Sequence, residues 1–128
     1  MLVIFVLLSP TVPSKPPGNV QAKSFMMPYE FDVTWDALEL KYWNGIPLGY
    51  MVTLSAISVG GVKLDPSTAV KHTKKISPQL TKCSFSGMHV YYQYGIQISA
   101  YTKIGAGEKS AMKFVGKLSY FIHVDRGR

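Results

Sequence analysis

Short runs of alternating apolar and polar residues, separated by turn residues, make up most of this 128-residue chain. The alternation is clearest in residues 31–36, 50–56 and 94–101, where every second side chain is apolar. A period of two places the apolar side chains on one face of a β-strand and the polar side chains on the other. No segment repeats its apolar residues with the 3.6-residue period of an amphipathic helix. The pattern therefore predicts an all-β protein.

Weaker alternation and turn residues complete the predicted set of strands. Further strands are expected within residues 20–23, 69–76, 83–85 and 112–118. Gly60-Gly61 stands between two β-rich runs, and glycine accepts the positive φ of a two-residue hairpin without strain. Strands at this spacing predict an antiparallel, two-sheet sandwich of seven strands with an immunoglobulin-like architecture.

The apolar face of each predicted strand defines the expected core. Because the side-chain period is two, a register error of one residue would turn a whole set outward. We expect Trp35, Tyr50, Tyr94, Ile96 and Ile98 to form the structural centre. The full expected core is Val20, Ala22, Phe31, Val33, Trp35, Tyr50, Val52, Leu54, Phe85, Met88, Tyr94, Ile96, Ile98 and Ala100.

Closely spaced prolines mark the expected start of the folded domain. Four of them lie within residues 10–17, where they favour an extended linker and oppose strand formation. We therefore expect a leader or linker at residues 1–12, the sandwich at residues 13–117 and a tail at residues 118–128. Residues 1–8 are apolar like the tail of a signal peptide, but no Lys or Arg precedes them and no Ala-x-Ala-like site follows. A signal segment and the remnant of a preceding element both remain open.

Several motifs occur in a recognisable order along the chain. They are residues 13–22, Trp35 at the end of the second strand, Asn44-Gly45 before residues 49–52, residues 85–88, the alternating residues 94–102, and Gly105, Gly107 and Ser110. No single motif is specific, but their order and spacing together resemble the fibronectin type III domain family. The resemblance covers about residues 13–117 and implies one non-catalytic domain, a binding or spacer module of a larger protein.

The resemblance gives two aromatic residues structural roles. Trp35 is a large apolar plate suited to the middle of a sandwich without a disulfide. Tyr94 is similar to the tyrosine of a tyrosine corner, whose ring is buried while its hydroxyl bonds to backbone a few residues upstream, here near Met88. The chain departs from the family pattern at Ala37-Leu38 and at Val90, where prolines are usual. These departures concern the loops more than the fold.

The formal net charge of +7 is unevenly distributed. Residues 63–117 contain nine lysines and two acidic residues, whereas residues 30–39 contain four carboxylates. A basic excess attracts polyanions such as sulfated glycans, although it is also common on ordinary solvated faces. The candidate polyanion-binding residues, which we expect to converge on one patch, are Lys63, Lys71, Lys74, Lys75 and Lys82.

Catalytic and metal-binding chemistry is not expected. The single cysteine, Cys83, points inward in the strand pattern, where a thiol behaves as a small hydrophobe and not as a nucleophile paired with His89. His72, His89 and His123 lack the spacing of zinc ligands, and the carboxylates of residues 30–39 lack the loop glycine of a calcium site. We predict no enzymatic activity, no cofactor and no metal.

The expected function is protein interaction or spacing within an adhesion or receptor-type protein, outside the cell or at its surface. Two alternatives stay open: a module of an intracellular scaffold or muscle-type filament protein, and a module that binds sulfated glycan. The expected partners are neighbouring domains or a protein ligand, and not nucleic acid. Residues 103–108 lack the Arg-Gly-Asp tripeptide that some members of the family carry in this loop. No apolar run reaches the roughly 18 residues that span a bilayer.

Overall fold

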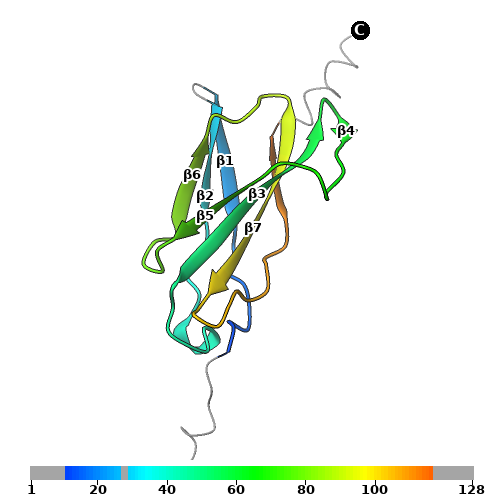
Figure 1. Ribbon diagram of the computed structural model, residues 1–128. Helices are drawn as coiled ribbons and strands as arrows, with labels where there is room; N and C mark the ends of the chain where they lie inside the picture. The colour runs from blue at the N-terminus through cyan, green and yellow to red at the C-terminus, as the bar shows by residue number, and fades with distance from the viewer. Residues whose placement is uncertain (1–10, 27–28, 117–128) are drawn as a thin grey trace, which may run out of the picture.

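Two antiparallel sheets pack face to face in the computed structural model, which describes residues 11–26 and 29–116 (Figure 1). The three-stranded sheet has the order β1-β2-β6, with β1 (Gln21–Met26), β2 (Tyr29–Thr34) and β6 (Lys82–Ser86). The five-stranded sheet has the order β4-β3-β7-β8, and β5 also pairs with β3. Its strands are β3 (Gly49–Val59), β4 (Val62–Lys63), β5 (Lys71–Ile76), β7 (Tyr92–Tyr101) and β8 (Lys113–Gly116). A 3₁₀ turn, η1 (Leu40–Tyr42), precedes β3.

The predicted two-sheet sandwich is confirmed, with one strand more than the seven expected. The additional strand is β4, which continues the Gly60-Gly61 hairpin and pairs with the end of β3. Both glycines have positive φ, 59° and 83°, as a tight hairpin requires. The described chain enters at one pole of the sandwich and ends, at Gly116, near the opposite pole (Figure 1).

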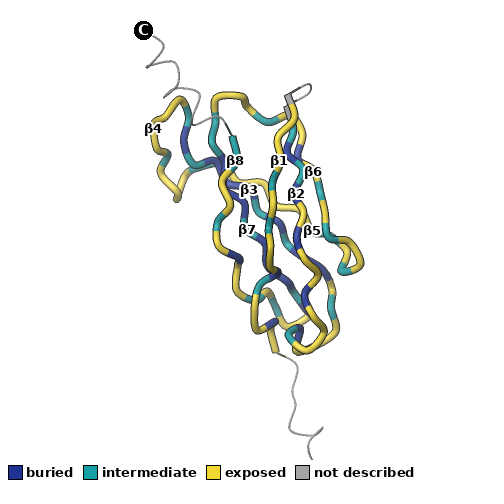
Figure 2. Tube along the Cα trace, turned by 180° about the vertical axis from the view of Figure 1, so that it is seen from behind, coloured by how far each residue is buried: buried dark blue, intermediate teal, exposed yellow. Residues whose placement is uncertain are grey.

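The core lies between the two sheets, and buried residues alternate with exposed ones along the strands (Figure 2). Trp35 is 4% exposed and Tyr50 is 1% exposed, and the rings meet edge-on with centroids 5.4 Å apart. The buried apolar residues are Phe31, Val33, Trp35, Leu38, Trp43, Tyr50, Val52, Leu54, Ala56, Phe85, Tyr94, Ile96, Ile98 and Ala100. Three residues of the expected core, Val20, Ala22 and Met88, are only partly buried and pack against its margin.

The last strand, β8, turns Val115 and not Phe114 toward the core. The sequence predicted a strand within residues 112–118, and residues 117–118 lie outside the described part of the chain. In the structure Val115 pairs with Tyr94 and packs against the core, whereas Phe114 pairs with Gly95 and is exposed. The four-residue strand is too short for its own pattern to fix the register, so pairing with β7 decides it.

A loop that sequence reasoning left unassigned closes the entry pole of the core. Trp43 is 2% exposed, and its indole Nε1 donates a hydrogen bond to the Leu38 carbonyl oxygen at 3.0 Å. The backbone N–H of Leu38 donates to the Tyr50 hydroxyl at 3.1 Å. Leu38 stands where the family usually has proline, and its N–H, which proline would lack, fixes this loop to the core.

Candidate interaction surface

Three of the five candidate lysines share the outer face of the five-stranded sheet. Lys71 pairs with Ser55 and Lys75 with Met51. Val52 and Leu54, which lie between these two partners on β3, face the core, so Ser55 and Met51 face outward. Lys63 pairs with Ser58 on the same outer face. Strand alternation therefore brings Lys63, Lys71 and Lys75 to one side of the molecule.

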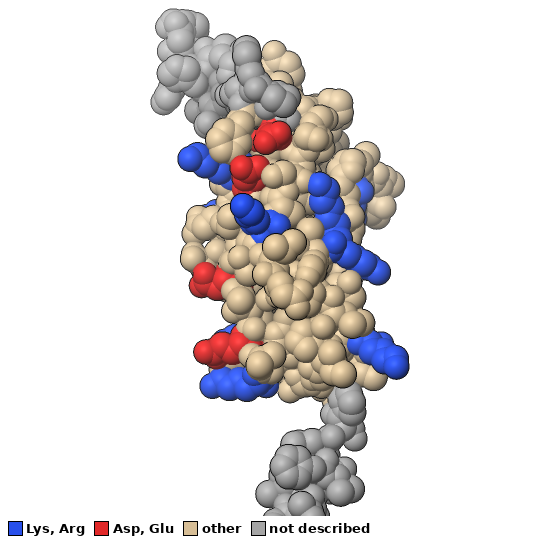
Figure 3. All heavy atoms as spheres, turned by 90° about the vertical axis from the view of Figure 1, so that its left-hand side faces the viewer, with Lys and Arg blue, Asp and Glu red and all other residues tan. Residues whose placement is uncertain are grey.

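The other two candidate lysines lie elsewhere. Lys74 alternates to the inner side of β5, where its ammonium lies 5.0 Å from the Phe85 ring centroid and donates to the Ser84 carbonyl oxygen. Lys82 pairs with Thr34 on the outer face of the three-stranded sheet and so does not share a face with Lys71. Figure 3 looks onto the edge of the sandwich where β5 and β6 lie. Basic side chains lie on both sides of this edge with uncharged surface between them, and acidic side chains lie among those on one side.

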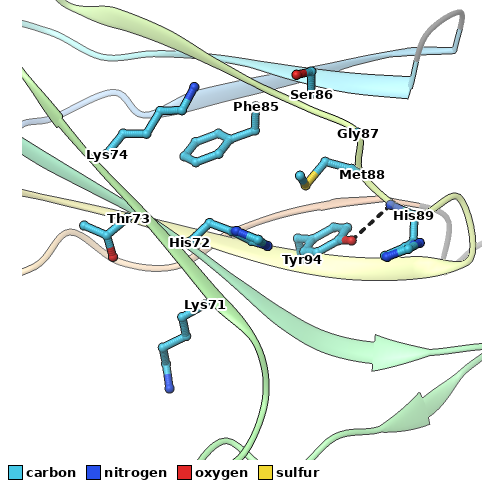
Figure 4. Close-up of a pocket in the computed structure, with 10 residues that line it drawn as sticks. All are labelled: Lys71, His72, Thr73, Lys74, Phe85, Ser86, Gly87, Met88, His89 and Tyr94. Carbon is cyan, nitrogen blue, oxygen red and sulfur yellow. Dashed lines mark hydrogen bonds between the residues drawn. The ribbon is translucent and has the colours of Figure 1, made fainter.

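A cleft of about 620 Å³, which we call the edge cleft, opens between β5 of one sheet and β6 of the other (Figure 4). His72 points toward Tyr94, Met88 projects between Phe85 and Tyr94, and Lys71 is turned away. The lining residues are Lys71, His72, Thr73, Lys74, Phe85, Ser86, Gly87, Met88, His89 and Tyr94. The lining is mixed, with lysine, histidine and hydroxyl side chains beside Phe85 and Met88, and it includes no described carboxylate, so the cleft suits an acidic or polar side chain.

Tyr94 fixes the loop at the end of the edge cleft. Its hydroxyl accepts a hydrogen bond from the backbone N–H of His89 at 3.1 Å, so the partner is a backbone group next to Met88, as expected. Its ring meets Phe31 edge-on, with centroids 5.3 Å apart, and stacks on Tyr92. Burial raises the pKa of the Tyr94 hydroxyl, which therefore stays protonated at neutral pH. The contact positions the loop and supplies no ionised group.

The other candidates for chemistry are occupied or inert. Burial raises the pKa of the Cys83 thiol to about 11, so the thiolate required of a nucleophile is scarce at neutral pH. Asp32 accepts a hydrogen bond from the Ser84 hydroxyl at 2.8 Å across the sheet. In residues 11–26 and 29–116, no three His, Cys, Asp or Glu side chains are grouped to hold a metal ion. His123 lies outside this part of the chain.

Comparison with known families decides to which family this sandwich belongs. The model of the fibronectin type III domain matches residues 15–114. The chain belongs to the fibronectin type III family. Tyr94, with its bond to the upstream backbone, is the corner tyrosine of this fibronectin type III domain, as the resemblance implied. No helix in the described residues is long and apolar enough to cross a membrane.

Relatives of this fibronectin type III domain include proteins of much greater length. The chain is 30% identical over 109 residues to Protein sidekick-1 of Gallus gallus, covering 85% of this chain and 5% of the relative. It is 32% identical over 103 residues to Cell adhesion molecule DSCAM of Gallus gallus, covering 80% of this chain and 5% of the relative. The chain therefore spans about one twentieth of the curated relatives it matches.

Solved fibronectin type III structures share the fold. The third fibronectin III domain of human KIAA0343 protein superposes with a TM-score of 0.69 at 18% identity, covering 85% of this chain and 86% of that one. The FN1–FN3 domains of chicken CNTN1 give a TM-score of 0.63 at 20% identity, covering 80% of this chain and 32% of that one. At these identities the likeness concerns the architecture of the domain.

The edge cleft itself was not predicted from the sequence. The available signal was the alternation in β5, which places His72, Lys74 and Ile76 on the face opposite Lys71 and Lys75. The residue type alone does not predict exposure, because the long aliphatic chain of lysine can lie along an apolar surface while its charge remains at the edge. Lys74 does this against Phe85.

Proposed function

We propose that this domain is a non-catalytic protein-interaction module in the extracellular part of a multidomain adhesion or receptor-type protein. The observation that carries the proposal is the course of the described chain, which enters at one pole and reaches Gly116 near the other, so that both outer sheet faces and the edge cleft are open among the described residues (Figure 1). The names of its relatives support the adhesion context, since several are called cell adhesion molecules.

An apolar hollow at the entry pole supports contact with neighbouring domains. This hollow, of about 380 Å³, includes Ile46, Leu48 and Ile104, which are 80%, 47% and 57% exposed. The entering chain is held beside it, because Thr11 donates its N–H to the Asn44 carbonyl oxygen at 3.0 Å. Exposed apolar patches of this kind mark interaction surfaces.

A cell-binding experiment tests the protein-interaction proposal. Beads that carry the full 128-residue chain are expected to bind cells saturably, and trypsin treatment of the cells should abolish the binding. Beads that carry an unrelated domain of similar net charge are the control. Binding no stronger than that of the control would contradict the proposal.

Antibody labelling tests separately whether the module lies outside or inside the cell. An antibody against the domain is expected to label intact cells of a tissue that expresses the parent protein. Labelling only after permeabilisation would favour the alternative, a module of an intracellular scaffold or filament protein.

We also propose a weaker, salt-sensitive interaction with sulfated glycans. Lys63, Lys71 and Lys75 favour it because they share one outer face. Salt screens such contacts over about 8–10 Å, so elution from heparin should need little salt and the Lys71→Gln variant should elute earlier. Lys82→Gln, on the other sheet, is the matched control. Equal shifts for both variants would show that net charge, and not this face, causes the retention.

A further inference from the structure

A second hollow, which we call the outer groove, lies on the outer face of the five-stranded sheet and has a volume of about 420 Å³. One of its walls comes from the segment between β4 and β5, where Leu64, Pro66 and Ala69 line it. The opposite wall consists of Met112 and Phe114, just before and within β8. The groove is distinct from the edge cleft, with which it shares a single lysine among the residues that line the two.

Small residues at the centre of the sheet let the Met112 side chain lie close against the sheet beside the outer groove. Lys71 on β5 pairs with Ser55 on β3, which pairs with Gly95 on β7. Gly95 pairs in turn with Phe114 on β8. Two small residues thus lie between two large ones in one row across four strands. A Cβ at Gly95 would collide with the sulfur of Met112, so this flexible side chain lies directly over the glycine.

Positive charge borders the outer groove without a neutralising partner in its lining. Lys63, Lys71 and Lys109 line the groove, and no Asp or Glu of the described residues does so. The nearby Asp65 is engaged in its own turn, where it accepts hydrogen bonds from the backbone N–H and the hydroxyl of Ser67 at 3.0 and 2.9 Å. A ligand that brings a carboxylate to this rim would meet the ammonium groups of three lysines.

The apolar surface of the outer groove is accessible. Phe114 is 54% exposed, and a ligand that covers it removes apolar surface from water, which favours binding. The Lys71 ammonium donates to the Pro66 carbonyl oxygen at 3.0 Å, which holds one positive charge beside the apolar wall. An apolar group and an adjacent anion can therefore be bound together.

We propose that the outer groove binds a segment of a protein ligand that presents a bulky apolar side chain next to Asp or Glu. This inference rests on the proposed protein-interaction function and names the surface and the chemistry of the partner. A polypeptide fits an open groove on a sheet face, because its side chain enters while its backbone stays in water. A sulfated glycan matches the lysines but offers no bulky apolar group for Phe114 and Leu64.

Selection from a library of random peptides displayed on phage tests the proposal with the full 128-residue chain as bait. The selected peptides are expected to carry an aromatic or aliphatic residue beside Asp or Glu. Phe114→Glu should weaken their binding at least about tenfold, because it puts a carboxylate on the apolar wall. Lys109→Glu should weaken it by a similar factor, because it removes the charge complementarity.

Matched controls come from the three-stranded sheet. Phe25→Glu and Lys82→Glu make the same changes at an exposed Phe and an exposed Lys, and each should alter affinity by less than about twofold. Thermal melting of all four variants verifies folding. In NMR spectra, the methyl resonance of Met112 in the unmodified chain should shift on peptide binding, which does not depend on any variant folding.

Three outcomes would overturn the groove proposal. If the selected peptides bind Phe114→Glu with the same affinity as the unmodified chain, they bind elsewhere. Selection of basic peptides would contradict the charge argument. Binding of a heparin oligosaccharide that is lost in Lys109→Glu but unchanged in Phe114→Glu, with no peptide selected, would assign the surface to polyanions.

The cell-binding assay separates this inference from the proposed function. If beads carrying Phe114→Glu bind cells as well as the unmodified chain does, the interaction function stands and the groove proposal fails. If the unmodified chain binds no cells while the selected peptides bind the groove, the groove proposal stands and the adhesion role fails.

Discussion

Two buried tyrosines near opposite ends of the sandwich make the same kind of hydrogen bond in different surroundings. Tyr50 and Tyr94 lie on the adjacent strands β3 and β7, where they pair with Ala100 and Ala56 at the two ends of the ladder. Each hydroxyl accepts one backbone N–H at 3.1 Å, from Leu38 and from His89 respectively. The bond of Tyr50 lies in a closed interior, whereas that of Tyr94 borders the edge cleft.

The surrounding rings explain the difference between the two ends. Tyr50 lies between Trp35 and Trp43, with ring centroids 5.4 Å away in both cases, and its partner Leu38 is buried. At Tyr94 the donor residue His89 is exposed. The same covalent group thus seals a loop at one end and fixes the margin of an accessible cleft at the other. One end of the core is therefore closed by aromatic packing, whereas the other borders an accessible cleft.

The largest expected effect comes from removing the Trp43 side chain, which closes the core at the Tyr50 end. Trp43→Ala should lower the free energy of unfolding by about 3–5 kcal/mol, because it opens a cavity and leaves the Leu38 carbonyl oxygen without its donor. Met88→Ala, at the half-buried margin of the open end, should cost less than about 2 kcal/mol. Urea denaturation measures both. Equal losses would show that the two ends do not differ in packing.

Removing one hydroxyl at each end sharpens the comparison. Tyr50→Phe should cost about 1–3 kcal/mol, because the buried Leu38 N–H loses its acceptor. Tyr94→Phe should cost about 0.5–1.5 kcal/mol, since water in the edge cleft can reach the N–H of His89. The difference between the two variants in chemical denaturation is the test. A larger loss for Tyr94→Phe would mean that its end is also sealed.

The sequence predicted the open end better than the sealed one. Tyr94 was assigned its upstream bond because it continues a strand of regular alternation and stands at the family position. Leu38 and Trp43 were missed because they lie around a 3₁₀ turn, where period-two alternation does not apply. Their burial depends on Tyr50, which is distant from Leu38 in sequence.

Candidate surfaces were harder to predict than strands for a related reason. Strand alternation assigns a face to Lys71 or Lys75 only after the pairing of β5 with β3 is known. Lys82 was grouped with them by proximity in sequence, although it belongs to the other sheet. The outer groove combines residues that are distant in sequence, such as Ser55 of β3, Gln97 of β7 and Met112 before β8, and no local pattern contains that set.

A smaller effect is expected where a lysine bridges the sheets across the edge cleft. Lys74→Met keeps the aliphatic contact with Phe85 but removes the charge over its ring and the bond to the Ser84 carbonyl oxygen. The loss of stability should be about 0.5–1 kcal/mol. Lys82→Met, on the exposed outer face, should change stability by less than about 0.5 kcal/mol. Indistinguishable melting temperatures for the two variants would contradict a bridging role.

The smallest expected effect is a pH dependence from Cys83, which lies on β6 and pairs with Val33 of β2. Burial raises its pKa from 9.0 to about 11, an effect that Lys74 partly opposes and Asp32 increases. Because the pKa is higher in the folded state, the contribution to stability is complete below pH 9 and is lost as the pH rises through about 11. The side chain is only half-buried, so the loss between pH 8 and pH 10 should be about 0.5 kcal/mol or less.

Urea midpoints at these two pH values should differ less in Cys83→Ala than in the unmodified chain. Tyr94→Phe controls for the raised pKa of that hydroxyl, which acts in the same direction at higher pH. An identical pH dependence in Cys83→Ala, or rapid reaction of the native thiol with a disulfide reagent at neutral pH, would show that Cys83 is open to solvent.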